Sequence, residues 1–529
     1  MTAQANGTES PAVFLRNASG LVKSAGPFDV FTYNLGLISV GIAITLVHYW
    51  VPSNYPGANI PVSEVIAASA MACIAFCFWA WSVAIPRSGG IYAFVSRGIN
   101  PAIGFAVSFV DTFTWLFYNA LAATFLTSIG LAPAFFVTGI TTHNEKLIEI
   151  AFRLQTPIAQ FLVGSGGVLV AGAILIRGMK AFFSVQRLLF VTALLGIVAT
   201  VLSLARTHPQ ESQAVFIKAM TPYVTGGAGV FAMHQEPWVM SWRMTLLASV
   251  WPILSFVGSI FSVNIGGEIR NVRKSQALGI FGSIVISAAL MIIVSMQFET
   301  AYGKTFEALL GTLGSRSVLP MPPYFSLLAG LAARNLALSI LIFIGFFCWA
   351  FFWIPATLVY AARAVLAWSF DRVAPAALGY VHPRWHTPVS AILLVVVVNV
   401  AFLGLFLFFP YFATLVLVLA AMLAWIPTMA GAIAFPYLRR KLFNECPLAG
   451  KKLLGLPLMS VAGAVGLLGT IVLTVMLWND PIAAGHGAHS LITIAVVFIL
   501  GLGWYAGTRA VRRRQGIDID RAFKEIPIE

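Results

Sequence analysis

Charged residues and cysteines are scarce in this chain. Asp, Glu, Lys and Arg together make up 9% of its 529 residues, whereas a soluble domain contains about 25%. This shortage excludes an ordinary soluble protein. The chain has only four cysteines, and their spacing predicts no disulfide framework. Cys73 and Cys77 share a helix face, but no His or acid lies near them, so we expect them to pack rather than to bind a metal.

Other absences exclude whole classes of function. No Gly-x-x-x-x-Gly-Lys-Ser/Thr loop is present, which argues against an ATP-driven pump. No cluster of carboxylates with His indicates a catalytic centre, so we predict that the protein is not an enzyme. The eight His residues show no metal-ligand spacing on a common face, and we predict neither metal nor cofactor. The formal charge of +14 is dispersed over the chain, so we expect no nucleic-acid partner.

The abundant feature is the long apolar stretch. Hydrophobic residues make up 59% of the chain, and a membrane-spanning helix needs about 20 apolar residues in succession. The sequence therefore predicts an all-α polytopic membrane protein that contacts the lipid bilayer. About twelve stretches have this length: residues 29–50, 62–85, 102–130, 157–176, 182–205, 246–268, 277–298, 335–366, 389–409, 411–435, 457–478 and 490–508.

Positive charge alternates between the segments that join these stretches. If the stretches cross the bilayer in turn, 24 of the 32 Lys and Arg residues fall on one side. Because the basic side is cytoplasmic, we predict a multi-pass protein of the cell membrane with both termini in the cytoplasm. The predicted organisation is a disordered cytoplasmic arm (1–26), a transmembrane domain (27–508) and a cytoplasmic tail (509–529).

Two of the stretches contain small residues near their middle. Residues 34–42 read Asn-Leu-Gly-Leu-Ile-Ser-Val-Gly-Ile, and residues 251–260 read Trp-Pro-Ile-Leu-Ser-Phe-Val-Gly-Ser-Ile. Many transporters hold their substrate between helices that are broken at Gly or Pro in the two halves of an inverted repeat. These stretches lie five spans apart, as a five-plus-five repeat requires. Close helix packing is the alternative, because membrane helices use small residues for that too.

Three loop motifs carry a resemblance to a known family. Residues 86–92 read Pro-Arg-Ser-Gly-Gly-Ile-Tyr, and residues 268–274 read Glu-Ile-Arg-Asn-Val-Arg-Lys. Asp-Arg-Val-Ala-Pro at 371–375 precedes His-Pro-Arg-Trp-His-Thr-Pro at 382–388. The chain resembles the amino acid–polyamine–organocation (APC) superfamily of amino acid permeases over essentially its whole length. The resemblance implies a leucine-transporter-like 5+5 inverted repeat, with broken helices 1 and 6, that works by alternating access.

The resemblance also implies a substrate site. In the family, backbone amides of broken helix 1 bind the substrate carboxylate, and broken helix 6 offers carbonyls to the amine and side chain. Ser259 and Ile260 stand where the family often has an aromatic residue and an acid. This departure favours neutral or apolar substrates. The implied substrate-binding residues are Ser39, Val40, Gly41, Ser255, Phe256, Gly258 and Ser259.

Charged residues provide two further sets of candidates. Asp111 lies within the third stretch, where an ionisable group is costly and usually faces a cavity or a partner. It is a candidate for binding a proton or the substrate amine, and a structural acid bonded to neighbouring hydroxyls is the alternative. The candidates for a cytoplasmic gate, which are otherwise plain interfacial charges, are Glu268, Arg270, Arg273, Asp371 and Arg372.

The predicted function is secondary active transport of amino acids or related amines across the plasma membrane, as a proton symporter or an exchanger. A transport-dead amino-acid sensor on the same fold is the alternative. The coupling ion, H⁺ or Na⁺, stays open: the fifth stretch lacks the mid-span Lys of some proton-coupled relatives, and Ser339 and Thr357 stand too far apart for a sodium site. The protein is expected to act as a monomer or homodimer, without an ancillary subunit.

Overall fold

The protein is a bundle of long helices in the computed structural model, which describes residues 20–224, 226–232, 237–480 and 487–523. Within these ranges, twelve helical segments are long and apolar enough to cross a membrane. They confirm the prediction of an all-α polytopic membrane protein. In chain order the spans are Pro27–Asn54, Ile60–Ala84, Pro101–Thr142, Pro157–Ile176, Met179–Leu204, Trp242–Asn264, Val272–Tyr302, Leu336–Phe370, Val389–Phe408, Val418–Leu438, Leu458–Asn479 and Ala488–Arg514.

Nine of these spans are single helices, and three are composite. The single helices are, in order, α3, α8, α9, α13, α16, α17, α19, α21 and α22. The first span consists of α1 (Pro27–Ile38) and α2 (Val40–Asn54). The third consists of α5 (Pro101–Phe125), the π-helix η1 (Leu126–Leu131) and α6 (Ala132–Thr142). The sixth consists of α11 (Trp242–Ala248), α12 (Val250–Phe256) and the 3₁₀-helix η4 (Val257–Asn264).

Short elements join the spans, and one of them is a β-hairpin in which Lys452 pairs with Pro457 in antiparallel register. The connecting elements are α4 (Gly90–Gly98), α7 (Glu145–Arg153), α10 (Pro209–Met220), η2 (Thr221–Tyr223), η3 (Gly227–Ala232), η5 (Gly266–Glu268), α14 (Lys304–Ser315), α15 (Phe325–Ala332), η6 (Ala376–Gly379), α18 (Pro410–Ala413), α20 (Arg440–Asn444), β1 (Lys452–Leu453), β2 (Leu456–Pro457) and η7 (Ile519–Phe523).

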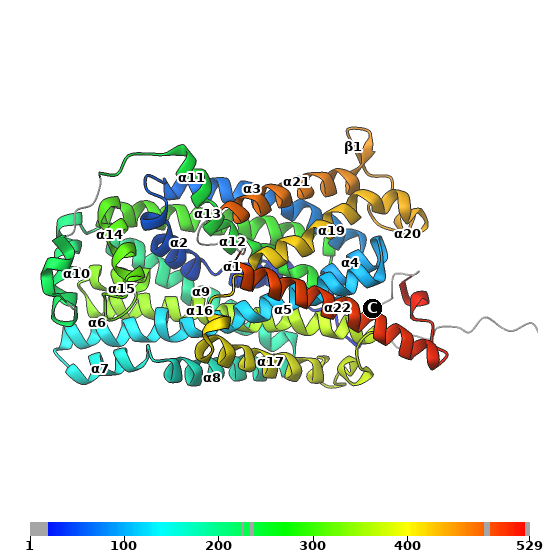
Figure 1. Cartoon of the computed structure of the whole chain (residues 1–529), viewed down its shortest axis with the longest axis horizontal. Helices are drawn as coiled ribbons and strands as arrows, with labels where there is room; N and C mark the ends of the chain where they lie inside the picture. The colour runs from blue at the N-terminus through cyan, green and yellow to red at the C-terminus, as the bar shows by residue number, and fades with distance from the viewer. Residues whose placement is uncertain (1–19, 225, 233–236, 481–486, 524–529) are drawn as a thin grey trace, which may run out of the picture.

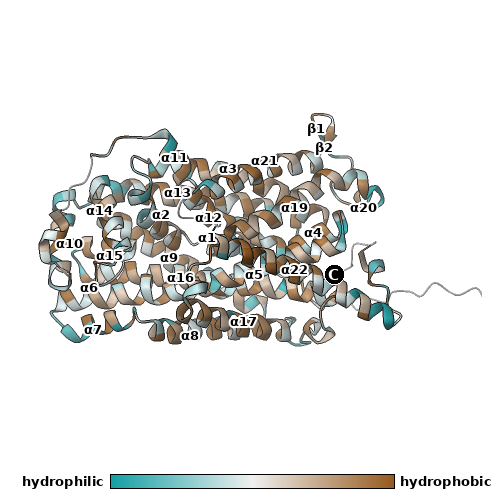
Figure 2. Ribbon diagram, in the orientation of Figure 1, coloured by the Kyte–Doolittle hydropathy of each residue, from teal (hydrophilic) through white to brown (hydrophobic). Residues whose placement is uncertain are grey.

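The bundle has two distinct ends along its long axis (Figure 1). One carries α4, α20 and the C-terminal part of the chain, and we call it the terminal end. The other carries α7, α10, α14 and α15, and we call it the far end. Figure 2 shows apolar residues along the long helices, with hydrophilic residues gathered on α7, on α20 and on the last turns of α22. This distribution suits a bundle whose middle lies in lipid and whose ends meet water.

Two predicted span boundaries differ from the structure. The third span was expected to end near residue 130, but it stays helical to Thr142 because the wider turn of η1 carries the chain past Pro133 without breaking the helix. The tenth span was expected to begin at 411, but α19 begins at Val418. Pro410 opens the separate short helix α18, and Phe409 before it is extended, as residues that precede proline usually are.

The first span is interrupted at Ser39. This residue has φ 46° and ψ 74°, a left-handed conformation that ends α1 and precedes α2. Left-handed backbone is costly for a non-glycine residue and persists only where the surroundings enforce it. The Ser39 side chain does not cap α2. The first amides of α2 therefore have neither an intrahelical partner nor a side-chain cap.

The sixth span changes its winding at the same depth. Helix α12 ends at Phe256, and the chain continues as eight residues of 3₁₀-helix in η4. A 3₁₀ run of this length is uncommon, since its hydrogen bonds are poorer than those of an α-helix. The side chain of Asn34 fastens it to α1: Oδ1 accepts the amide of Ser262 at 3.0 Å, and Nδ2 donates to the Ser262 hydroxyl at 3.0 Å.

The two irregular segments meet at Gly258. A Cβ atom placed on Gly258 would lie 2.3 Å from the carbonyl carbon of Leu37 and 2.4 Å from the amide nitrogen of Ile38. Both are backbone atoms, which cannot move aside as a flexible side chain can. Only glycine therefore permits this crossing of η4 over the last turn of α1.

We expect Gly258→Ala to lower the free energy of unfolding by about 1–3 kcal/mol, because the added methyl group forces the two backbones apart. Gly166→Ala in α8 is the matched control, since a Cβ there meets nothing within 4 Å. Thermal unfolding of the purified protein in detergent checks the difference. Equal melting temperatures for the two variants would show that the two backbones can move apart without loss of stability.

Candidate substrate-binding and gating sites

The interruption at Ser39 is enclosed on one side by α16. The hydroxyl of Ser39 donates to the carbonyl of Trp349 at 2.8 Å. A Cβ on Gly41 would lie 2.6 Å from Cδ1 of the Trp349 ring, so the indole packs directly on the backbone of α2. Ser39 and Val40 are fully buried. The open amides of α2 thus lie in a protected interior, where a half-helix N-terminus attracts an anionic group.

The candidates on the sixth span are buried beside this interruption. Ser255, Phe256, Gly258 and Ser259 occupy the junction of α12 and η4. Within the described part of the chain, the hydroxyl of Ser259 and Nε1 of Trp349 are buried without a hydrogen-bond partner. An unsatisfied buried polar group costs about 1–3 kcal/mol. A buried polar group without a partner in a native protein needs an explanation. A polar ligand that binds these groups is one such explanation.

Asp111 lies in the interior but already has three donors. Its Oδ1 accepts Nε1 of Trp115 at 3.0 Å and Nε1 of Trp425 at 3.3 Å, and its Oδ2 accepts the hydroxyl of Tyr360. The ring of Phe261 from η4 lies 4.3 Å from that of Tyr360, between centroids. Asp111 is therefore connected to the sixth span through aromatic neighbours, and its partners come from α5, α16 and α19.

The terminal end holds a buried ion pair between Glu268 and Arg363. Nε and Nη2 of Arg363 bind the two carboxylate oxygens at 2.6 and 3.1 Å. Each side chain is only 1% exposed. A forked arginine–carboxylate pair is among the strongest polar contacts that side chains make. It joins the end of the sixth span to α16 and so closes this end between them.

A second buried pair lies close by. Arg97 of α4 contacts both carboxylate oxygens of Asp371, at 2.9 and 2.7 Å, with each side chain 3% exposed. The guanidinium of Arg97 also lies 5.1 Å from the ring centroid of Phe523 in η7. This pair connects α4 to the end of α16, and the C-terminal segment packs over it.

The other three gate candidates lie nearer the surface. Arg270 is exposed and donates to the carbonyl of Lys23 at 3.1 Å. Arg273 is exposed and its carbonyl accepts Nε1 of Trp79 at 3.2 Å. Arg372 has φ 60°, and its carbonyl accepts Nε of Arg512 at 3.3 Å. Two of the five candidates, Glu268 and Asp371, thus form buried ion pairs within the described residues.

Sequence reasoning did not select the two basic partners. Neither Arg363 nor Arg97 was among the predicted site residues. The one available signal was position: Arg363 lies near the end of the 35-residue helix α16, whose other residues are almost all apolar. A lone charge in such a helix needs a partner, but the sequence does not say which acid supplies it.

The Ser-Gly-Gly motif explains how the two pairs are brought together. Gly89 has φ 98° and donates its amide to the carbonyl of Asn264 at 3.0 Å. A Cβ on Gly90, whose φ is 44°, would lie 1.7 Å from Oδ1 of Asn264. The turn before α4 therefore fits directly against the end of η4. The arm contributes as well, because the amides of Ser24 and Ala25 donate to the carbonyl of Glu268.

The predicted arm and tail are only partly described. Residues 1–19 and 524–529 lie outside the described residues. On the C-terminal side, α22 extends to Arg514, beyond the predicted boundary at 508, and Arg509 pairs with Asp520.

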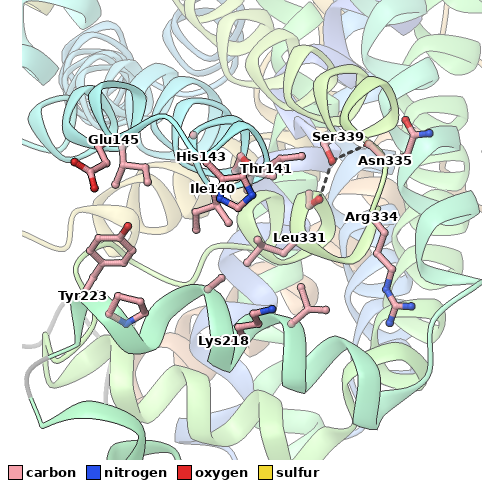
Figure 3. A pocket seen from close by; sticks show the side chains of 17 residues that line it. Ile140, Thr141, His143, Glu145, Lys218, Tyr223, Leu331, Arg334, Asn335 and Ser339 are labelled. Carbon is pink, nitrogen blue, oxygen red and sulfur yellow. Dashed lines mark hydrogen bonds between the residues drawn. The ribbon is translucent and has the colours of Figure 1, made fainter.

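The far end has an open pocket of about 520 Å³. Figure 3 shows His143 and Glu145 on one side of it, Lys218 and Tyr223 on another, and Arg334 near Asn335. The hydroxyl of Ser339 is already hydrogen bonded, because it donates to the carbonyls of Gly330 and Asn335 at 2.9 and 3.0 Å. None of the predicted site residues lines this pocket. It is separate from the interruption at Ser39.

Comparison with known proteins agrees with this architecture. The family model described as amino acid permease matches residues 26–502. The chain belongs to this family. The match includes both interrupted spans and the paired residues of the terminal end, so the resemblance expected from the loop motifs is confirmed for this permease.

Two curated relatives are similar to the permease at low identity. The branched-chain amino acid permease BcaP of Lactococcus lactis subsp. cremoris is 23% identical over 482 residues, which cover 85% of this chain and 89% of the relative. The methylthioribose transporter of Bacillus subtilis is 21% identical over 281 residues, covering 53% of this chain and 55% of the relative. The family and these relatives indicate a transporter of small molecules rather than an enzyme.

We expect Glu268→Gln to lower the free energy of unfolding by about 3–5 kcal/mol, because Arg363 is left buried without a counter-charge. The double variant Glu268→Gln with Arg363→Met removes both charges and is expected to recover most of this loss. Thermal unfolding in detergent measures both.

Glu149→Gln is the matched control for this pair. Glu149 pairs with Arg153 at 2.6 Å on the exposed face of α7, and its loss should cost only about 0.3–0.5 kcal/mol. If Glu268→Gln were no more harmful than Glu149→Gln, the buried pair would not hold the terminal end together.

Proposed function

We propose that this permease moves amino acids, or closely related amines, across the plasma membrane by alternating access. The observation that carries the proposal is the meeting of two interrupted spans at Ser39 and Gly258. Gly258 lies against Leu37 and Ile38, just before the open amides of α2, and the hydroxyl of the next residue, Ser259, is buried without a partner in the described residues. In this reading the two spans are broken helices 1 and 6 of a 5+5 inverted repeat, and the break between them is the substrate site.

The chemistry of the break suits an amino acid. The substrate carboxylate binds the amides of Val40 and Gly41, where the helix N-terminus favours negative charge. The amine binds carbonyls of the 3₁₀ segment and the hydroxyl of Ser259. Phe256 and Ile260 bring apolar surface rather than a second carboxylate to this place. Neutral, apolar amino acids therefore fit best, in accord with the relative named for branched-chain amino acids.

Asp111 remains the candidate for the substrate amine or a proton within the bundle. Its oxygens already accept three hydrogen bonds. A direct role therefore requires at least one of these bonds, such as that from Tyr360, to open when substrate arrives. In the state described here, Asp111 fixes Trp115 and Tyr360 beside η4.

The gate at the terminal end consists of the pairs Glu268–Arg363 and Asp371–Arg97. Both are buried, and each joins α16 to a segment from the first half of the repeat or from its sixth span. Opening this end requires their separation or their movement as a unit. Arg270, Arg273 and Arg372 stay candidates at its surface. We assign this end to the cytoplasm because 24 of the 32 basic residues fall on its side of the predicted topology.

Uptake into liposomes tests the proposal. The purified permease is reconstituted, and uptake of labelled leucine, isoleucine and valine is compared with that of lysine and glutamate, with and without an inward proton gradient. We expect the apolar amino acids to be preferred. Stimulation by the gradient indicates proton symport, and uptake only into preloaded liposomes indicates exchange. Binding without uptake in either format would favour the amino-acid sensor.

Ser259→Ala tests the site itself. We expect the KM for the preferred amino acid to rise by about 5–10-fold, because one hydrogen bond to the substrate is lost. Ser69→Ala is the control, since the hydroxyl of Ser69 is on the exposed face of α3 and bonds only the carbonyl of Val65. An unchanged KM in Ser259→Ala would remove this residue from the substrate site.

Asp111→Asn tests whether this acid takes part in transport. An asparagine side chain can accept from the indoles but cannot replace both carboxylate oxygens as acceptors. We expect uptake to fall by about tenfold or more if Asp111 binds the substrate amine or holds the aromatic ring set in place. Wild-type uptake by this variant would leave Asp111 without a part in transport.

A further inference from the structure

The far end contains a buried chain of hydrogen-bonded side chains that the proposed mechanism does not use. Nδ1 of His48 lies 3.0 Å from Oε2 of Glu307, and Nε2 of His48 lies 3.0 Å from the hydroxyl of Ser295. The same hydroxyl contacts Oε1 of Glu64 at 2.8 Å. These four residues come from α2, α14, α13 and α3, and none is more than 6% exposed. We call them the His48 chain.

Apolar rings surround the middle of the His48 chain. The imidazole lies 4.7 Å from the ring of Phe298 and 5.5 Å from that of Phe325, between centroids. Such walls exclude water from the ring and from Ser295. The partners of His48 are therefore the protein groups themselves, and any change in its protonation must pass through them.

Other titratable groups face the chain from the same elements. The closest charged pair is Glu299 with Lys304, at 3.2 Å, and Lys304 also lies 3.7 Å above the ring of Trp238. A further pair, Tyr55 with Asp480, is hydrogen bonded nearby. Among the nearby phenols, Tyr302 packs against the ring of Phe298, and Tyr49 packs against Tyr324. Lys304 also lines the same small cavity as Glu307 of the His48 chain.

The outer acids of the chain each have a free oxygen. Oε2 of Glu64 and Oε1 of Glu307 are buried without a partner in the described part of the protein. A cavity of about 20 Å³ borders Glu307 and is also lined by Glu299 and Lys304. This is room for about one water molecule. Glu307 is thus the member with access to water, and Glu64 is the inner end of the chain.

Each of the three contacts shares one proton. Ser295 has a single hydroxyl proton, and when it points to Glu64, Nε2 of His48 must carry the proton that bonds Ser295. The contact between Nδ1 of His48 and Glu307 then contains one more proton, on the ring or on the carboxyl group. In this arrangement Glu64 is ionised.

A second arrangement satisfies the same contacts. In it Glu64 carries a proton and donates to Ser295, Ser295 donates to Nε2 of His48, and Nδ1 donates to an ionised Glu307. The number of protons and the total charge are unchanged. One proton has left the His48–Glu307 pair and one has arrived on Glu64, by hops from Nε2 to Ser295 and from Ser295 to Glu64.

We propose that the His48 chain is a proton-binding site, which takes a proton from water at Glu307 and passes it through His48 and Ser295 to Glu64. This inference rests on the proposed permease function, for which it supplies the coupling site. Histidine suits the role because its ordinary pKa is close to neutral pH. Asp111 suits it less, since two of its three partners are indole N–H groups, which cannot accept a proton.

The position of His48 connects the proton to the substrate. Helix α2 begins at the interruption where the substrate amides lie, and His48 follows Val40 by eight residues on the same helix. At 1.5 Å per residue, this separation is about 12 Å. Proton transfer changes the bonds that hold α2 to α3, α13 and α14. Substrate and proton therefore act on the same helix, about 12 Å apart.

Two transport assays distinguish a loss of proton coupling from a loss of transport itself. His48→Gln and Ser295→Ala are reconstituted, and uptake of the preferred amino acid is measured into empty liposomes with an inward proton gradient, and into liposomes preloaded with the same amino acid. Both variants are expected to lose gradient-driven uptake by about tenfold. Exchange involves no net proton movement, so it should stay within about twofold of wild type.

The matched control is Glu211→Gln. Glu211 lies at the same end and pairs with Arg334 at 2.9 Å on the exposed surface, so this variant should behave as wild type in both formats. Glu64→Gln adds a measurement that needs no transport. Infrared spectra of wild type recorded across neutral pH should contain the carbonyl band of a protonated carboxyl group, which Glu64→Gln loses and Glu211→Gln keeps.

Each outcome decides a separate point. Gradient-driven uptake that survives in His48→Gln and Ser295→Ala overturns the proposal, as does wild-type uptake into empty liposomes that the proton gradient does not stimulate; both leave the permease function standing. Stimulation by an inward Na⁺ gradient instead of protons reassigns the chain to Na⁺. Wild-type protein that neither takes up nor exchanges amino acids overturns the proposed function, and with it the coupling.

Discussion

Gly258 and the last turn of α1 touch through their backbones, and this crossing makes the rest of the interior possible. In lipid, a backbone group that leaves its helix must find another partner. The structure meets this requirement by placing two irregular segments against each other and fastening them with the Asn34–Ser262 bonds. The amides that remain open face a dry interior rather than lipid. An interruption that would be costly in an isolated helix thereby becomes a polar site inside the bundle.

Hydrophobic length and turn residues predicted the spans and the place of the interruptions, since both properties are local. The third span continues through η1, and α19 starts late, because of how the backbone at these places packs against neighbouring helices. The local sequence pattern does not contain that information. The same limit applies to the sites. Glu268 and Asp371 were identified by their motifs, but Arg363 and Arg97 become their partners only through folding. The four residues of the His48 chain lie on four separate elements, so no spacing in the sequence predicts that they meet.

The two ends of the bundle use different chemistry for buried polar contacts. At the terminal end, arginines pair with carboxylates in forked geometry, and arginine stays charged at any physiological pH. At the far end, the buried contacts are made by histidine, serine and glutamates, whose protons can be rearranged without moving an atom of the backbone. One end is therefore held by fixed charges, and the other by mobile ones. Under the proposed coupling, a proton gradient acts on the far end and leaves the terminal end unaffected.

The carboxylate of Asp111 has a consequence for how the molecule can be observed. Two of the fourteen tryptophans, Trp115 and Trp425, point their indole N–H groups at this single charge, while Tyr360 reaches it from α16. Indole emission depends on the electric field along the ring. Any rearrangement of α16 relative to α5 and α19 would change that field at both rings together. The permease thus carries a native optical reporter, sensitive to any movement of α16 relative to α5 and α19 and requiring no attached dye.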